Sequence, residues 1–232
     1  MSHPVMATVL LLFLVSVMPV WGWLDMRRLK RLNSASARSR SYLITIATMW
    51  LLALLATLLL PASLWVAPTS PMAAVQLGPV PPGALIGIST GLMLGLLMPV
   101  LMARLKPELI ERQMAPIRFM LPTTSAQRWL FVLLSLTAGI TEEWIYRGFV
   151  LHYISTAWPT LTVWPALVGA ALLFGIAHAY QGWLRIVVTT SLGLFFSLLY
   201  LGTGNLLLPM LLHALIDLRI LLLLPKIRPA AK

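Results

Sequence analysis

Cysteine is absent from this 232-residue chain, so neither a disulfide framework nor a thiolate metal site can form. Charge is scarce as well, since 10% of the residues are charged while 59% are hydrophobic. The mean hydropathy is +0.91. A soluble domain of this size could not cover so much apolar surface, whereas a lipid bilayer solvates it. The sequence therefore predicts an all-α membrane protein, a polytopic bundle of transmembrane helices.

Acidic residues are few, with 6 Asp and Glu against 17 Lys and Arg, which gives a formal net charge of +11. In a soluble protein this excess would suggest a nucleic-acid partner. Here the basic residues lie in the connections between apolar segments. They indicate membrane topology first and contacts with the anionic lipid of the bilayer second, so we expect no nucleic-acid partner.

A helix that crosses the hydrocarbon core needs about 20 mostly apolar residues. The first such segment lacks a basic region before it and a small-residue cleavage site after it, so we interpret it as a retained helix rather than a signal peptide. The Pro-rich stretch 67–83 is expected to be an external loop. Seven spans are predicted in all, at residues 5–24, 42–66, 84–103, 128–152, 161–180, 184–202 and 205–224.

The positions of the basic residues predict one orientation. Clusters lie in 25–41, in 104–128 and in the tail 225–232, whereas the stretches 67–83 and 153–160 contain no Lys or Arg. Seven spans with the N-terminus outside and the C-terminus inside place every cluster on the cytoplasmic side. Many tryptophans lie near predicted helix ends, as in an interfacial belt, but Trp50 and Trp144 do not.

The fourth predicted span carries the sequence TEEWIYRG at residues 141–148. An ionisable residue at the centre of a membrane helix costs about 2.5–3.5 kcal/mol on translocon scales, so such residues are candidates for function. Glu143 and Arg147 are four residues apart, which predicts an ion pair. This pair could be a purely structural bridge between helices. Glu142 lies on an adjacent face without a local partner, as suits a general base or acid.

Two histidines lie in later spans. Phe174 and His178 share one face of the fifth span, and His213 and Asp217 share one face of the seventh. A lone histidine on an apolar helix is more often a hydrogen-bonded packing residue than a ligand. Two histidines and an aspartate, together with the adjacent glutamates, instead indicate an active site shared by three helices.

These groups fit the hydrolysis of a peptide bond in two ways. A glutamate can activate water while one histidine positions it or carries a proton and the other donates to the oxyanion. Alternatively, Glu142, His178 and His213 could bind Zn²⁺, which lowers the pKa of its water to about 7. The spacing is not the His-Glu-x-x-His of soluble zinc proteases. Both schemes use the same residues, so the sequence leaves zinc as a possible cofactor.

Three motifs thus follow one another along the chain. They are Glu142-Glu143-x-x-x-Arg147, then Phe174-x-x-x-His178, then His213-x-x-x-Asp217. In this order they resemble the CAAX-protease and bacteriocin-processing family of intramembrane proteases. The resemblance covers about residues 125–222, and residues 1–124 show no motif. It divides the chain into N-terminal helices at 1–124, a protease core at 125–224 and a short basic tail at 225–232.

The resemblance implies an intramembrane endopeptidase that cleaves a membrane-associated or processed peptide or protein. It implies a multi-pass protein of a bacterial cytoplasmic (inner) membrane, with the site in a cavity inside the bilayer. Asp217 stands where prenyl-protein proteases usually have Asn. Prenylation of the substrate and the oligomeric state stay open. The implied roles are water activation by Glu142, assistance by Glu143 and His178, oxyanion binding or orientation by His213 and Asp217, and positioning by Arg147 and Phe174.

Two functions of other classes use the same residues. One is a non-catalytic membrane immunity or peptide-binding protein, and the other is a proton-coupled transporter, although two similar halves are not evident. The predicted topology also contains a mismatch. It places His178 near the cytoplasmic end of its helix and both Glu142 and His213 nearer mid-membrane, an offset on the order of 10 Å. We therefore expect either shifted helix boundaries or helices that are tilted or offset.

Overall fold

The computed structural model describes residues 3–60 and 82–224, and within these ranges it contains helices and no strand. The predicted all-α class is confirmed. The hydrocarbon core of a bilayer has no water to pair with backbone N–H and C=O groups, and a helix satisfies these groups within its own segment. In chain order the elements are α1 (His3–Leu12), the π-helical η1 (Phe13–Val17), α2 (Met18–Leu32), α3 (Ala35–Leu59), α5 (Pro82–Leu105), α6 (Pro107–Met114), the 3₁₀-helical η2 (Ala115–Met120), α7 (Ser125–Glu143), the π-helical η3 (Trp144–Val150), α8 (Leu151–Ala157), α9 (Val163–Ala177), the 3₁₀-helical η4 (Ala179–Gln181), α10 (Trp183–Thr203) and α11 (Leu207–Leu223).

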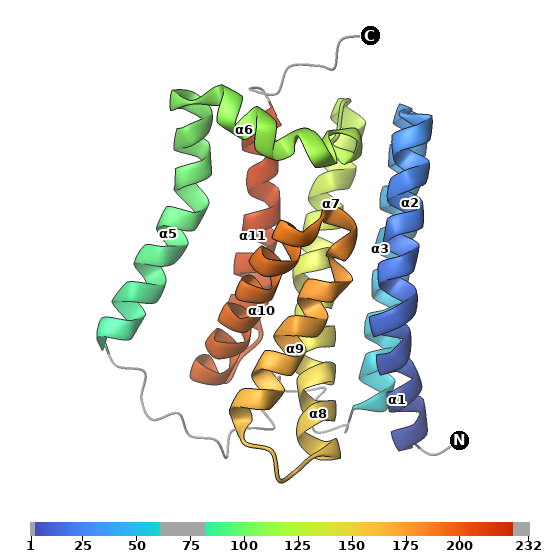
Figure 1. Ribbon diagram of the computed structural model, residues 1–232, viewed down its shortest axis with the longest axis vertical. Coiled ribbons are helices and arrows are strands. Elements are labelled where there is room, and N and C mark those ends of the chain that lie inside the picture. The colour runs from blue at the N-terminus through green and yellow to red at the C-terminus, as the bar shows by residue number, and fades with distance from the viewer. Residues whose placement is uncertain (1–2, 61–81, 225–232) are drawn as a thin grey trace.

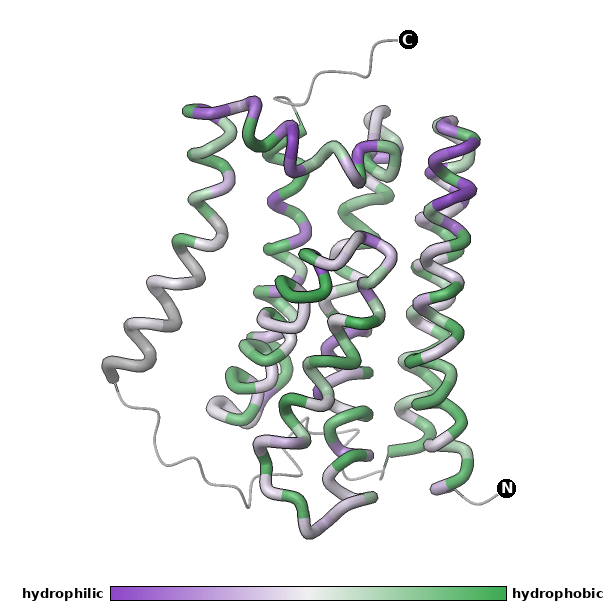
Figure 2. Tube along the Cα trace, viewed as in Figure 1, coloured by the Kyte–Doolittle hydropathy of each residue, from purple (hydrophilic) through white to green (hydrophobic). Residues whose placement is uncertain are grey.

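The helices lie roughly side by side, and α6 crosses one end of the bundle (Figure 1). Figure 2 shows that hydrophilic residues gather at this end, on α6 and on the last turns of α2. The connections predicted to be cytoplasmic, 25–41 and 104–128, therefore meet at the same end of the molecule. Of the other expectations, the loop 67–83 up to residue 81 and the tail 225–232 lie outside the described residues.

Within residues 3–60 and 82–224, three helical stretches are long and apolar enough to cross a membrane, namely Pro4–Leu32, Ala35–Leu59 and Trp183–Thr203. The predicted helices are found with shifted ends, and α9 at Val163–Ala177 is shorter than the segment predicted there. The count of seven spans and the orientation of the termini therefore stay predictions. What the structure supports is an integral membrane protein with apolar helices.

The main hydrophobic core joins the N-terminal helices to the segment after the glutamates. Buried residues of α1 and α3, such as Leu10 and Ala56, pack in one cluster with Phe149 and Val150 of η3 and with Leu167 of α9. Side chains of this kind contribute about 1.5–3 kcal/mol each when they are removed from water, but in a bilayer close packing is the larger part of the gain.

Two tryptophans that did not fit an interfacial belt have structural partners. Trp50 Nε1 donates a hydrogen bond to Thr137 Oγ1 at 3.2 Å, and Trp144 Nε1 donates to Thr57 Oγ1 at 2.8 Å. Both bonds join α3 to the continuous helix formed by α7 and η3. The N-terminal helices are thereby attached to the segment that carries the glutamates.

Helix α5 is attached by an unusual hydrogen bond. Pro99 lies inside α5 and has no N–H, so the carbonyl of Gly95 lacks its normal partner in the helix. Arg219 of α11 supplies a replacement, since its Nη1 donates to Gly95 O at 2.6 Å. Away from this end of the bundle, α5 slants away from α11 (Figure 1).

The hairpin of α9 and α10 is offset from the other helices. In Figure 1 the turn between them lies in the upper half of the molecule, below the level of α6. Helix α9 has 15 residues, a length of about 22 Å, which is less than the ~30 Å of a hydrocarbon core. The end of α9, where His178 lies, is therefore set back from the polar end of the bundle.

Candidate active site

The two glutamates lie at the end of α7, where the α-helix passes into the π-helical segment η3. Helix α11 approaches α7 closely one turn earlier, at Gly139. A Cβ atom built on Gly139 would lie 2.7 Å from the backbone nitrogen of Ala214 and 2.8 Å from the carbonyl oxygen of Met210. No larger residue fits there without displacing backbone. The absence of a side chain at Gly139 brings His213, which precedes Ala214, against the glutamates.

Glu143 is the centre of a fully buried ionic network. Its Oε1 accepts a hydrogen bond from Arg147 Nη1 at 3.0 Å, and the two side chains are 0% and 1% exposed. The predicted ion pair is therefore present. Arg147 Nη2 also donates to the carbonyl of Gly193 at 2.8 Å, and the guanidinium lies 4.7 Å from the Phe174 ring centroid. A buried pair is tolerated only with such additional partners.

His213 joins this network from α11. Its Nδ1 lies 2.7 Å from Glu143 Oε1, and because a carboxylate oxygen accepts, Nδ1 is the donor. The ring stacks on Phe196, with centroids 5.3 Å apart and planes at 17°. Nε2 is left facing the open part of the site, 3.8 Å from Glu142 Oε2 and 3.9 Å from Asp217 Oδ2.

His178 approaches from the end of α9. Its Nδ1 lies 2.9 Å from the carbonyl oxygen of Phe174, so Nδ1 donates and Nε2 is free to accept. That Nε2 lies 4.0 Å from Glu142 Oε2. The predicted topology separated His178 from Glu142 by about 10 Å in depth, and the offset of the α9–α10 hairpin along the bundle removes this mismatch. Phe174 supports the site twice, since its ring also lies edge-on to His213 with centroids 5.9 Å apart.

Glu142 Oε2 has no hydrogen-bond partner within the described part of the chain. Its nearest polar neighbours are the Nε2 atoms of His178 and His213, at 4.0 and 3.8 Å. Separations of this size leave room for one water molecule about 2.8 Å from each atom. Side-chain exposure rises from 12% at Glu142 to 18% at His178 and 35% at Asp217, so the site opens on the side of Asp217.

Zinc fits these groups by chemistry but not by spacing. Two imidazole nitrogens and a carboxylate are a common zinc ligand set, with ligand atoms about 2.0–2.2 Å from the metal and therefore about 3.4 Å from one another. The separations of 3.8 and 4.0 Å are longer. Among the residues that the structure describes, no group of three or more His, Cys, Asp or Glu is arranged to hold a metal ion. As they stand, the side chains fit a water molecule better than a zinc ion.

Asp217 lies at the rim of the site and makes no hydrogen bond to His213, because 3.9 Å is too long. Glu143 is the residue that orients His213. Sequence reasoning missed two aromatic residues, Phe196 beside His213 and Tyr180, whose ring stacks on His178 with centroids 6.2 Å apart. The position of Tyr180 two residues after His178 was the one signal available, and no periodic pattern singles out either residue.

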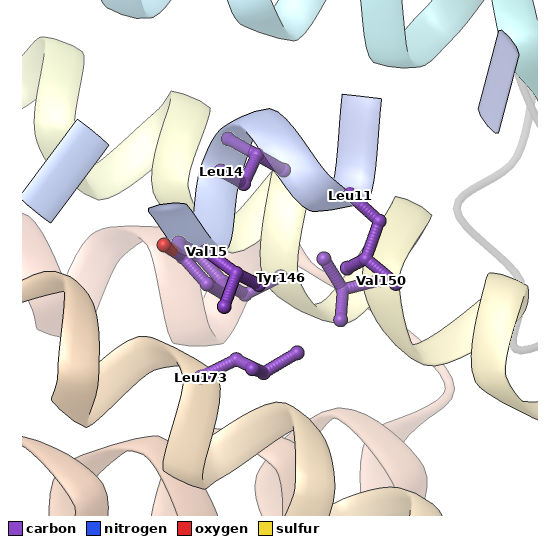
Figure 3. A pocket seen from close by; sticks show the side chains of 6 residues that line it. All are labelled: Leu11, Leu14, Val15, Tyr146, Val150 and Leu173. Carbon is purple, nitrogen blue, oxygen red and sulfur yellow. The ribbon is translucent and has the colours of Figure 1, made fainter. Parts of the chain in front are cut away.

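A small pocket elsewhere is apolar. It lies between the π-helical segments η1 and η3 (Figure 3). It contains no carboxylate or imidazole, so it is not a candidate site for peptide hydrolysis. The side chains that line it are Leu11, Leu14, Val15, Tyr146, Val150 and Leu173.

Comparison with known proteins supports the family suggested by the motifs. Residues 124–219 match the model of the Rce1-like family, described as type II CAAX prenyl endopeptidase Rce1-like. The match begins at Thr124, the N-cap of α7, and ends within α11, so it contains all seven motif residues. The predicted resemblance is confirmed over this stretch. Neither curated proteins nor solved structures give a match.

Proposed function

From the premise that residues 124–219 form an Rce1-like domain, we propose that the chain is an intramembrane endopeptidase of the glutamate type. Its substrate is a membrane-associated or processed peptide or protein, and its location is a bacterial inner membrane. One observation carries the mechanism. The unpartnered Oε2 of Glu142 lies 4.0 Å from Nε2 of His178, which is free to accept a hydrogen bond, and 3.8 Å from Nε2 of His213.

The reaction begins with a water molecule bound between these three atoms. Its two O–H groups donate to Glu142 Oε2 and His178 Nε2, and its oxygen accepts from the Nε2–H of His213. Glu142 takes one proton from this water, and the oxygen of the water attacks the carbonyl carbon of the scissile peptide bond. The tetrahedral intermediate then collapses, the bond from carbon to nitrogen breaks, and Glu142 returns the proton to the leaving amine. The products are one carboxyl terminus and one amino terminus, so protons balance over the cycle.

The histidines divide the remaining work. His178 accepts a hydrogen bond from the water through Nε2. This bond directs a lone pair of the water oxygen toward the substrate. His213 is fixed by its bond to Glu143, and its Nε2 faces the same space. His213 carries a proton on Nε2 throughout the reaction, Glu143 balances the charge of the ring, and this N–H donates to the oxyanion. Asp217, 3.9 Å from His213 Nε2 at the exposed rim, is placed to bind the arriving peptide.

The decisive experiment compares wild type with Glu142→Gln on fluorogenic peptides, with and without a prenylated cysteine, in detergent. Glu142→Gln keeps the shape of the side chain but removes the base, so kcat should fall about 10²- to 10⁴-fold. Glu108→Gln is the matched control, because Glu108 is an exposed glutamate on α6, and it should leave the rate unchanged. Full activity of Glu142→Gln would refute the proposal.

Two further outcomes separate the rival functions. Loss of activity with a chelator and its recovery with zinc would replace the glutamate mechanism by a metal mechanism. Peptide binding without cleavage, unaffected by Glu142→Gln, would indicate a non-catalytic peptide-binding protein. Proton flux into liposomes without proteolysis would indicate a transporter.

A further inference from the structure

We infer that Tyr180 is a positioning residue that holds the ring of His178 toward Glu142, and that Gly22 of α2 is the surface on which Tyr180 rests. The inference depends on the proposed function for the role of His178, but the packing it describes stands on its own. Gly22 lies outside the stretch that matches the family model. The N-terminal helices would thereby act on the active site.

His178 is weakly held by its own helix. It is the C-cap of α9, with φ −97° and ψ 8°, so no further turn of α-helix follows it. Within the described part of the chain its ring makes one hydrogen bond, from Nδ1 to Phe174 O. His213, in contrast, lies inside α11 and is hydrogen-bonded to a buried carboxylate. The ring of His178 therefore needs a second support.

Tyr180 provides that support by stacking. The centroids of the His178 and Tyr180 rings are 6.2 Å apart and their planes meet at 25°. The Phe174 ring lies 4.8 Å from His178 at 58°. Both distances are in the range in which aromatic pairs attract one another. His178 is therefore held between two aromatic contacts, one of which depends on where Tyr180 lies.

Gly22 determines where Tyr180 lies. A Cβ atom built on Gly22 would be 3.0 Å from Cδ1 and 3.4 Å from Cε1 of Tyr180, closer than most Cβ atoms come to a neighbour. The tyrosine ring thus lies directly on the backbone of α2. Glycine weakens the interior of a helix relative to alanine. Its presence in the middle of α2 is explained by the space that Tyr180 needs.

The effect on catalysis depends on the distance between His178 and Glu142. His178 Nε2 lies 4.0 Å from Glu142 Oε2, a separation that one bridging water spans. Displacing Tyr180 by a few tenths of an ångström tilts or frees the His178 ring and changes this separation. Since a misplacement of about 1 Å can cost about 100-fold in rate, a smaller shift should cost less but still be measurable.

The kinetic test uses variants on both sides of the contact. Tyr180→Leu removes the ring and should lower kcat about 10- to 100-fold with KM nearly unchanged, whereas Tyr180→Phe keeps the ring and should retain most of the rate. Gly22→Ala should lower kcat about 3- to 10-fold by pushing Tyr180. Gly169→Ala is the matched control, because its Cβ would lie at an ordinary 3.5 Å from Ile154 Cδ1. Unchanged kcat in Tyr180→Leu, or an equal loss in Tyr180→Phe, would overturn the inference.

A spectroscopic readout keeps this test independent of peptidase activity. In protein with isotope-labelled histidine, the His178 ring signal is the one missing from His178→Gln. It should move in Gly22→Ala and stay in place in Gly169→Ala, with thermal unfolding used to select folded variants. A His178 signal that is unchanged in Gly22→Ala would refute the contact. If wild type cleaved no peptide, the proposed function would fail, and the spectra would still decide whether Gly22 and Tyr180 position His178.

Discussion

Two regions along the α3–α7 helix pair hold their polar side chains in different ways. At the end near α6, Arg38 donates to the carbonyl of Phe119 at 3.1 Å, and Gln127 Nε2 donates to the carbonyl of Ala35 at 2.6 Å. At mid-depth, Arg147 and Glu143 form an ion pair with both side chains fully buried. The first set lies where polar residues gather (Figure 2), and the second lies among apolar helices. Polar groups at the helix end join loops, whereas the buried charges pair with each other, with His213 and with the carbonyl of Gly193.

Removing Arg147 should break this comparison most strongly. Arg147→Met leaves Glu143 buried without its cation, which typically costs 3–5 kcal/mol. Arg38→Met removes hydrogen bonds to neutral groups near the polar end and should cost about 1–3 kcal/mol. Thermal or denaturant unfolding in detergent measures both. Equal stabilities of the two variants would contradict the distinction between the two regions.

Substitutions of two histidines should distinguish a residue of the active site from one that lies outside it. His213→Gln removes the group that faces Glu142, so kcat should fall about 100-fold or more. His152→Gln is the control, since His152 on α8 belongs to no contact with the glutamates. Peptide cleavage in detergent measures both variants. Comparable losses at His152 and His213 would show that the effect is general and not specific to the site.

The close approach of α7 and α11 can be tested at Gly139. Gly139→Ala puts a methyl group 2.7 Å from the backbone of Ala214, so the helices must separate, at a cost of about 1–3 kcal/mol. Gly91→Ala, on α5, meets nothing within 4 Å and should be neutral or slightly stabilising. Unfolding and cleavage should both be impaired in Gly139→Ala. A neutral result there would mean that α11 is not held against the glutamates by this contact.

The smallest effect is expected where α3 meets η3. Trp144→Phe loses the hydrogen bond to Thr57 and should cost about 1 kcal/mol. Trp129→Phe changes an exposed tryptophan and should leave the unfolding free energy nearly unchanged. If the two variants differ by less than the error of the unfolding measurement, this hydrogen bond does not help to attach the N-terminal helices.

Spacing along the chain predicted what lies within one helix. The Glu143–Arg147 pair follows from a separation of four residues, and the helical class follows from composition. Spacing along the chain could not predict which residues of different helices touch one another. The bond from His213 to Glu143 joins residues 70 positions apart and depends on Gly139, and the depth of His178 depends on α9 ending at Ala177. A 20-residue window assumes that each helix crosses the whole bilayer. It therefore predicts the wrong position for the end of a shorter helix such as α9.

The turn between α9 and α10 has a consequence for hydration. A helix end carries carbonyl and amide groups without partners in the helix, and Gly182 provides no side-chain cap for α10. Hydrocarbon cannot satisfy such groups, so at mid-depth they require protein or water. We expect a chain of water molecules to reach this turn from the polar end of the bundle. Such a path would also deliver the reactant that Glu142 consumes, one molecule for each bond cleaved, while the substrate stays in the membrane.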